Sequence, residues 1–227
     1  MTKWMLPTSA LLLALVTQVY CQVTKEQQQA FTPDQVLEDL MAGNARFVSG
    51  NFTKRDITAK IIATAQGQYP KAVVLSCLDS RVPVEMVFDQ GLGDIFVGRV
   101  AGNVENEDQL GSMEFATKLA GAKLVMVLGH TECGAIKGAC DHAELGNLTA
   151  LLAKIRPAVD AVQGYQPEER NSANKEFVTK VTEQNVKLTV KNIRKKSPVL
   201  AGLEESGSIK IVGAIYDLQT GKVQLSE

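Results

Sequence analysis

Two short apolar stretches decide the fold of this chain. Residues 71–77 read Lys-Ala-Val-Val-Leu-Ser-Cys, and residues 124–130 read Leu-Val-Met-Val-Leu-Gly-His. Each run is short, apolar on both faces and rich in β-branched residues, which is typical of a strand buried in a parallel sheet. Functional groups of open α/β sheets collect at the carboxyl ends of the strands. We therefore expect Cys77 and His130 to lie at the same edge of one sheet.

Predicted helices alternate with predicted strands along the rest of the chain. This alternation implies right-handed crossovers between parallel strands. The sequence therefore predicts an α/β fold, with a mainly parallel central β-sheet flanked by helices, an N-terminal helical arm and a C-terminal hairpin. The last long helix is polar, so we expect it on the surface. The predicted strands cover residues 71–76, 95–100, 124–129, 209–216 and 222–225, and the predicted helices cover residues 33–50, 58–65, 83–88, 108–119, 134–139, 148–162 and 169–195.

Composition and charge suit a single globular domain. The chain has 227 residues, of which 45% are hydrophobic and 22% charged, and its net charge is −1. Proteins that bind nucleic acid usually present a strongly basic surface, so this balance argues against such a partner. Residues 10–16 form an apolar run too short to span a bilayer but of signal-peptide proportions. We expect residues 1–21 to be removed on export to the periplasm or outside the cell. The mature part, residues 22–227, then forms one catalytic domain with no membrane contact.

The two strand ends carry a set of metal ligands. The set consists of Cys77, His130 and Cys133, the last of which lies three residues after the histidine. Two thiolates and one imidazole can hold zinc and leave a fourth position for water, whose pKa zinc lowers to about 7. Each residue also has a simpler interpretation: a strand-end cysteine is often a small buried hydrophobic residue, and an exported protein can join two cysteines in a disulfide.

Two charged residues follow the first cysteine closely. Asp79 and Arg81 lie two and four residues after Cys77. In a sharp loop they can form a charge-assisted pair. The carboxylate can then accept a proton of a zinc-bound water in a hydrogen bond, or it can ligate the metal itself and close the site.

Together these motifs resemble the β-class carbonic anhydrases. The stretches that carry the resemblance are residues 77–83 (Cys-Leu-Asp-Ser-Arg-Val-Pro), residues 130–135 (His-Thr-Glu-Cys-Gly-Ala), and residues 93–99 and 101–103 between them. The similarity runs from about Ala42 to the C-terminus, and the pairing of the first two signatures is highly specific.

The resemblance implies an enzyme that reversibly hydrates carbon dioxide to bicarbonate and a proton by means of zinc-bound hydroxide. It implies one Zn²⁺ per chain, held by Cys77, His130 and Cys133. Asp79 and Arg81 would orient the hydroxide, and in some family members the aspartate becomes the fourth zinc ligand of a closed state. The backbone amide of Gly134 would help to bind substrate. The expected assembly is a homodimer or homotetramer.

The sequence departs from family members that are regulated by bicarbonate. Those members use a Trp, an Arg and a Tyr in a second pocket. Arg99 and Tyr216 match the last two, but Val74 occupies the position of the Trp. We therefore expect this pocket to be incomplete and the site to stay open at neutral pH. The second histidine, His142, is a candidate proton shuttle, although an exposed position at a helix end explains it as well.

Three alternatives remain open from the sequence. A hydrolase of carbonyl sulfide or carbon disulfide uses the same zinc ligands on the same fold. A non-catalytic zinc-binding protein would use Asp79 as a permanent fourth ligand, which Arg81 argues against by offering that carboxylate another partner. A thiol–disulfide protein is the third, but the sequence has no Cys-x-x-Cys motif.

Overall fold

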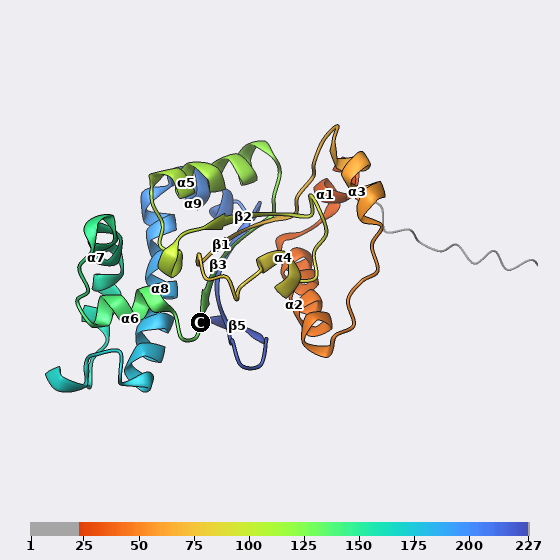
Figure 1. Cartoon of the computed structure of the whole chain (residues 1–227). Coiled ribbons are helices and arrows are strands. Elements are labelled where there is room, and N and C mark those ends of the chain that lie inside the picture. The colour runs from red at the N-terminus through yellow and green to blue at the C-terminus, as the bar shows by residue number, and fades with distance from the viewer. Residues whose placement is uncertain (1–22, 227) are drawn as a thin grey trace, which may run out of the picture.

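A five-stranded sheet forms the centre of the molecule in the computed structural model, which describes residues 23–226 (Figure 1). Its strand order is β2-β1-β3-β4-β5, and every pairing is parallel except the antiparallel one between β4 and β5. The predicted mainly parallel sheet and the C-terminal hairpin are therefore confirmed. The strands are β1 (Ala72–Ser76), β2 (Ile95–Arg99), β3 (Leu124–His130), β4 (Lys210–Tyr216) and β5 (Val223–Ser226).

The register between β1 and β3 decides where the site forms. Ser76, the last residue of β1, is paired with Leu128 of β3. Cys77 therefore leaves the sheet beside the last residues of β3, which ends at His130. Every residue of β1 and β3 is buried, as expected of central strands covered on both faces.

Helices α2 (Pro33–Ser49) and α4 (Val84–Val87) cover one face of the sheet. The helix predicted over residues 33–50 is confirmed as α2. Thr32 and Gln35 form a capping box at its start, and Gly50 ends it in a left-handed conformation. Val36 and Leu40 of α2 pack in the same core cluster as alternate residues of β1 and β3.

The side chain of Asn44 on α2 joins this helix to the end of the chain. Its amide nitrogen donates to the carbonyl oxygens of Val87 and Gly221, and its amide oxygen accepts from the backbone nitrogen of Val223. One buried side chain therefore connects α2, the end of α4 and the C-terminal hairpin.

The other face of the sheet is covered by α5 (Glu107–Glu114), the π-helical turn η2 (Phe115–Leu119), α8 (Lys175–Lys196) and α9 (Pro198–Glu205). Two expectations about α8 need correction. The helix begins at Lys175 rather than Glu169, because the side chain of Asn174 caps it by accepting from the amide of Phe177. It is also exposed on one side only, so the expected surface position holds for just that side. Its apolar side packs on the sheet, so closely that Val186 would touch a Cβ built at Gly129 or Gly213.

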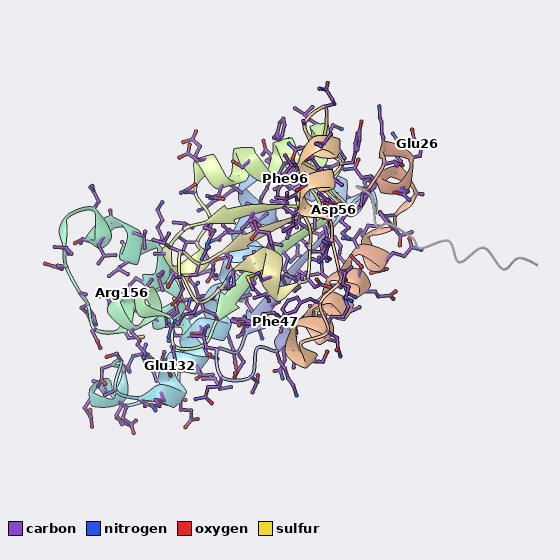
Figure 2. The ribbon with its side chains drawn as sticks, turned by 45° about the vertical axis from the view of Figure 1, so that its right-hand side comes forward. Glu26, Phe47, Asp56, Phe96, Glu132 and Arg156 are labelled. Atoms are coloured by element: carbon purple, nitrogen blue, oxygen red, sulfur yellow. The ribbon has the colours of Figure 1, made fainter. Side chains whose placement is uncertain are left out.

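The remaining helices lie at the two ends of the sheet. Figure 2 shows Arg156 of α7 at one end of the molecule and Glu26 of α1 toward the other. The N-terminal helical arm predicted from the sequence is made by α1 together with α2. The remaining elements are α1 (Lys25–Ala30), α3 (Ile57–Thr64), the short 3-10 turn η1 (Ala101–Asn103), α6 (Gly134–Cys140), α7 (Gly146–Ala161) and the 3-10 turn η3 (Pro167–Glu169).

Two of the expectations concern export and the membrane. The predicted export signal, residues 1–21, lies outside the described residues. Within residues 23–226, no helix combines the length and the hydropathy that crossing a bilayer requires.

A buried carboxylate fixes the segment that follows α4. Asp89 has a fully buried side chain and a positive φ of 46°. It accepts hydrogen bonds from Nε of Arg46 (2.5 Å), Nη1 of Arg55 (2.6 Å) and the hydroxyl of Thr53 (2.6 Å). Burial alone would raise the pKa of this carboxyl, but the hydrogen bonds from Arg55, Thr53 and Arg46 outweigh it and hold the pKa well below its usual value.

We expect Asp89→Asn to lower the free energy of unfolding by about 3 kcal/mol at pH 7, because it leaves two partly buried guanidinium groups without their carboxylate. Asn fits the positive φ, so the substitution tests the charge. Because the folded pKa of Asp89 is lowered, its contribution is present above the unfolded pKa of about 3.9 and is lost as the pH falls toward the folded value. Urea unfolding at pH 7 and pH 3 measures both effects. Asp34→Asn, in an exposed pair with Lys210, is the control and should cost less than about 1 kcal/mol.

Candidate metal centre

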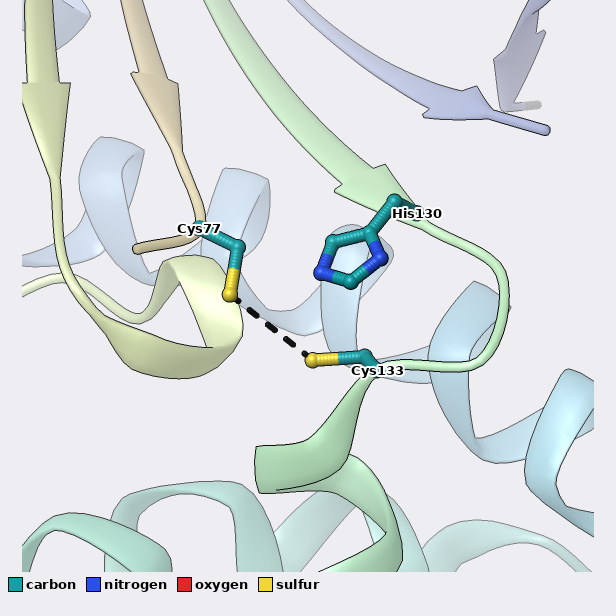
Figure 3. A group of neighbouring side chains, drawn as sticks. All are labelled: Cys77, His130 and Cys133. Atoms are coloured by element: carbon teal, nitrogen blue, oxygen red, sulfur yellow. Dashed lines mark hydrogen bonds between the residues drawn. The ribbon is translucent and has the colours of Figure 1, made fainter. Parts of the chain in front are cut away.

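Three potential metal ligands converge at the carboxyl ends of β1 and β3. Cys77 follows β1, His130 ends β3, and Cys133 directly precedes α6 (Figure 3). One ligand atom from each residue lies within 4.8 Å of the others, and all three residues are buried. The structure therefore brings together the three side chains that the sequence analysis singled out.

The imidazole of His130 is oriented for metal binding. Its Nδ1 lies 2.8 Å from the carbonyl oxygen of Thr131, which can only accept, so Nδ1 carries the proton. This leaves the lone pair on Nε2, which is buried and has no hydrogen-bond partner. A buried polar atom without a partner is costly, and a metal ion would satisfy it. The residues present therefore fit the zinc that the sequence analysis expects.

The two cysteines are free thiols whose Sγ atoms are 3.9 Å apart. They are therefore not joined in the disulfide considered from the sequence. The hydrogen bond from Cys133 lowers the pKa of the Cys77 thiol, and the hydrogen bond from the Gly102 amide acts in the same direction. The pKa of Cys133 is raised, because its proton is held by Cys77 and because the thiol is buried. One of the two thiols thus ionises readily, and a cation is needed to balance the charge of two thiolates.

Backbone amides around the sulfur atoms were not predicted. The Gly102 amide donates to Sγ of Cys77 at 3.3 Å, from a backbone with φ of 74° that favours glycine. The amides of Ala135 and Ile136, in the first turn of α6, lower the pKa of Cys133. Residues 101–103 entered the sequence analysis only as part of the family resemblance, because sequence spacing does not show that this segment folds back onto Cys77. Gly134 opens α6 beside the site, and its assignment to substrate stays a prediction.

Asp79 is paired with Arg81, as one of the two expectations for this loop requires. Its Oδ1 accepts from Nε of Arg81 at 2.9 Å, and its Oδ2 accepts from Nη2 at 2.7 Å. These hydrogen bonds hold the pKa of Asp79 well below its usual range. Oδ2 also lies 3.8 Å from Nε2 of His130, so the carboxylate borders the point where the ligands converge. The nearby carbonyl of Glu132, at 3.5 Å, accepts from the same guanidinium.

The residues of the expected second pocket have other roles in this structure. Nε of Arg99 donates to the carbonyl oxygen of Cys77 at 2.9 Å and thereby supports the ligand loop. Val74 and Tyr216 belong to the core cluster under α2. The pairing of Asp79 with Arg81 agrees with an open site, while the response of this site to bicarbonate and pH stays a prediction.

Two other residues lie away from the ligands. His142 follows the far end of α6 and contacts the guanidinium of Arg156. Cys140 is buried among apolar residues, and this burial raises the pKa of its thiol to about 11. The structure therefore places neither residue with the three ligands.

A mainly parallel sheet with two thiols and one imidazole at its carboxyl edge defines an α/β protein with a three-ligand metal site. A sequence model of the carbonic anhydrase family matches residues 72–223. The chain is 37% identical over 193 residues to a carbonic anhydrase of Mycolicibacterium smegmatis, with 82% of this chain and 89% of that protein covered. It is 35% identical over 189 residues to carbonic anhydrase 2 of Mycobacterium tuberculosis, with 83% and 90% covered.

Solved structures agree with this assignment. The β-carbonic anhydrase CafA of Aspergillus fumigatus has a TM-score of 0.63 at 26% identity, covering 85% of this chain and 89% of that one. One of the two tetrameric β-carbonic anhydrases of Sordaria macrospora gives 0.63 at 21% identity over 85% of this chain and 94% of its own, which supports the fold alone. The chain belongs to the β-carbonic anhydrase family. The expected family, fold and class of enzyme are confirmed.

We expect His130→Ala to weaken zinc binding by more than the 10- to 100-fold that loss of an outer-shell partner typically costs, because it removes a ligand atom. Competition with a chromogenic chelator measures the affinity, and elemental analysis measures the zinc retained after gel filtration. The matched control is His142→Ala, which removes the only other histidine and should leave the affinity unchanged. Equal loss in both variants would contradict the ligand assignment.

Proposed function

We propose that this chain catalyses the reversible hydration of carbon dioxide, in which CO₂ and H₂O give HCO₃⁻ and H⁺, with one Zn²⁺ held by Cys77, His130 and Cys133. The observation that carries the proposal is the buried, unpartnered Nε2 of His130, facing two sulfur atoms beside a carboxylate that is held by an arginine. Family membership supports the same reaction.

Bound zinc would lower the pKa of its water to about 7 and so supply a nucleophile at neutral pH. The role of the protein is to orient that nucleophile. A carboxylate in its ionised form only accepts hydrogen bonds, so Asp79 would accept a hydrogen bond from the nucleophile, without taking its proton, and so orient a lone pair of that oxygen toward the carbon of CO₂. Arg81 keeps Asp79 ionised and fixes its position through two hydrogen bonds.

The start of α6 suits the oxygen atoms of the product. Gly134 is exposed, and a Cβ built there would meet nothing within 4 Å, so there is space for a small ligand beside this residue. An amide at this position can donate to a bicarbonate oxygen. Water then replaces bicarbonate, and the released proton passes to buffer, since His142 lies at the other end of α6.

We further propose that the protein assembles as a homodimer or homotetramer and acts after export. The related Sordaria macrospora enzymes are tetrameric, and residues 10–16 have signal-peptide proportions. Light scattering after gel filtration tests the assembly. N-terminal sequencing of the protein purified from its source tests removal of residues 1–21.

Stopped-flow CO₂ hydration between pH 6.5 and 9, with zinc measured on the same sample, tests the proposed reaction. We expect about one zinc per chain and rapid hydration. Stoichiometric zinc without hydration at any pH would instead favour a hydrolase of carbonyl sulfide or carbon disulfide, or a structural zinc site.

Asp79→Asn should lower kcat/KM by about 100-fold, the lower end of what a positioned proton acceptor contributes. Zinc content should remain at one per chain, because in this structure Asp79 pairs with Arg81 rather than joining the three ligands. Lys180→Gln, in an exposed pair with Glu183, is a control of similar character and should retain full activity. An Asp79→Asn enzyme with unchanged kcat/KM would exclude the proposed orienting role.

A further inference from the structure

A polar cavity lies at the opposite edge of the sheet from the metal ligands. Its volume is about 590 Å³, and α1, α2, α3 and the segment after α4 contribute to its walls. These helices gather at one end of the molecule in Figure 1, where α1 and α3 are neighbours. Lys71, in its wall, immediately precedes β1, whereas Cys77 follows it. The five residues of β1, at about 3.3 Å each, therefore separate the cavity from the metal centre by roughly 17 Å.

Positive charge exceeds negative charge in the cavity wall. Four cationic side chains line it: Arg46, Arg55, Lys60 and Lys71. Only three carboxylates, those of Asp39, Asp89 and Asp94, line it as well. One positive charge is therefore unmatched. The two lysines are 6% and 8% exposed, and lysine is rarely buried to this extent without full compensation.

The carboxylates are already engaged. Asp89 accepts from both arginines and from Thr53. The oxygens of Asp94 accept from the ammonium of Lys60 at 2.7 Å and from the amide of Gly91 at 2.8 Å. Little acceptor capacity remains for the other donors of the cavity.

Several of those donors are unused. An ammonium group has three N–H donors, and Lys60 and Lys71 each donate one hydrogen bond, to Asp94 and Asp39. Arg46 donates through Nε alone. The amide nitrogen of Gln27 on α1 donates none, because that side chain caps its helix through its oxygen. The wall thus offers more hydrogen-bond donors than acceptors.

We propose that this cavity binds a small oxyanion, with inorganic phosphate and bicarbonate as the two candidate sources. Such an ion supplies the missing negative charge and offers only acceptors where donors are in excess. A metal cation would be repelled, and an apolar ligand would leave the remaining N–H donors of the two ammonium groups unused. Because Gln27 of α1 lines the same cavity as Lys71 at the base of β1, the bound ion would also join the N-terminal helix to the sheet.

Two substitutions with opposite expected effects test the site. Lys71→Gln removes a buried positive charge and should weaken binding by about tenfold or more. Asp39→Asn removes the partly exposed carboxylate that pairs with Lys71 and should tighten binding severalfold, since it leaves that ammonium free for the ligand. The opposite sign guards against a Lys71→Gln variant that simply folds poorly. Lys210→Gln, in the exposed pair with Asp34, is the matched control and should bind as the unaltered protein does.

Isothermal titration of the zinc-loaded protein with sodium phosphate, and separately with sodium bicarbonate, measures the affinity at constant ionic strength set by sodium chloride. One phosphate or bicarbonate per chain whose affinity falls in Lys71→Gln and rises in Asp39→Asn supports the proposal. The anion that shows this pattern identifies the source. Any anion that binds at the metal centre contributes equally in all variants. Equal binding in the three variants and the unaltered protein would overturn the proposed anion site, as would no binding beyond that of chloride. Neither result bears on CO₂ hydration.

Discussion

The parallel pairing of β1 with β3 is the constraint on which the site depends. The pairing of Ser76 with Leu128 places Cys77 beside the end of β3, level with Gly129 and one residue short of His130. A slip of one residue would turn Cys77 to the opposite face of the sheet and away from Gly102 and Cys133. The register is protected because both strands are buried on both faces, so any slip would expose or misplace a full row of apolar side chains. The position of the metal ligands is thus fixed by the packing of two whole strands.

Main-chain groups complete what the strands begin. The carbonyl of Thr131 selects the tautomer of His130, and the amide of Gly102 stabilises negative charge on Cys77. The side chain of Arg99 binds the backbone of the loop between Cys77 and Asp79, while the side chain of Arg81 binds the carboxylate of Asp79. The polar groups around the three ligands are therefore held by hydrogen bonds of their own, as the outer shell of a metal site requires.

Much of this arrangement could be predicted from the sequence, and the failures have physical causes. Cys77, His130 and Cys133 were found because they follow or end two apolar runs that read as buried parallel strands. The carboxyl ends of such strands meet at one edge of the sheet, so the residues there lie close together. The start of α2 was also predicted correctly, because the Thr32–Gln35 capping box that begins it is a local signal. The start of α8 was misplaced, because the acidic run before Asn174 suits a first helical turn as well as the true one. The burial of α8 was missed because only the fold shows that its valines meet glycines in β3 and β4. The amide of Gly102 was invisible for the same reason: a backbone donor has no sequence signature of its own.

The contacts of Asn44 have a consequence for how the chain reaches its native state. This side chain binds backbone groups of Gly221 and Val223, which are 177 and 179 positions away along the chain. Loop closure over such separations costs entropy and slows folding, so these contacts raise the contact order of the domain. During synthesis, α2 emerges early but cannot satisfy Asn44 until the last hairpin has left the ribosome. Until then Asn44 must remain hydrated, and the face of the sheet that α2 covers cannot be fully sealed. The domain should therefore acquire its cooperative stability only once β5 can pair with β4, with the earlier helices held in a loosely packed state meanwhile.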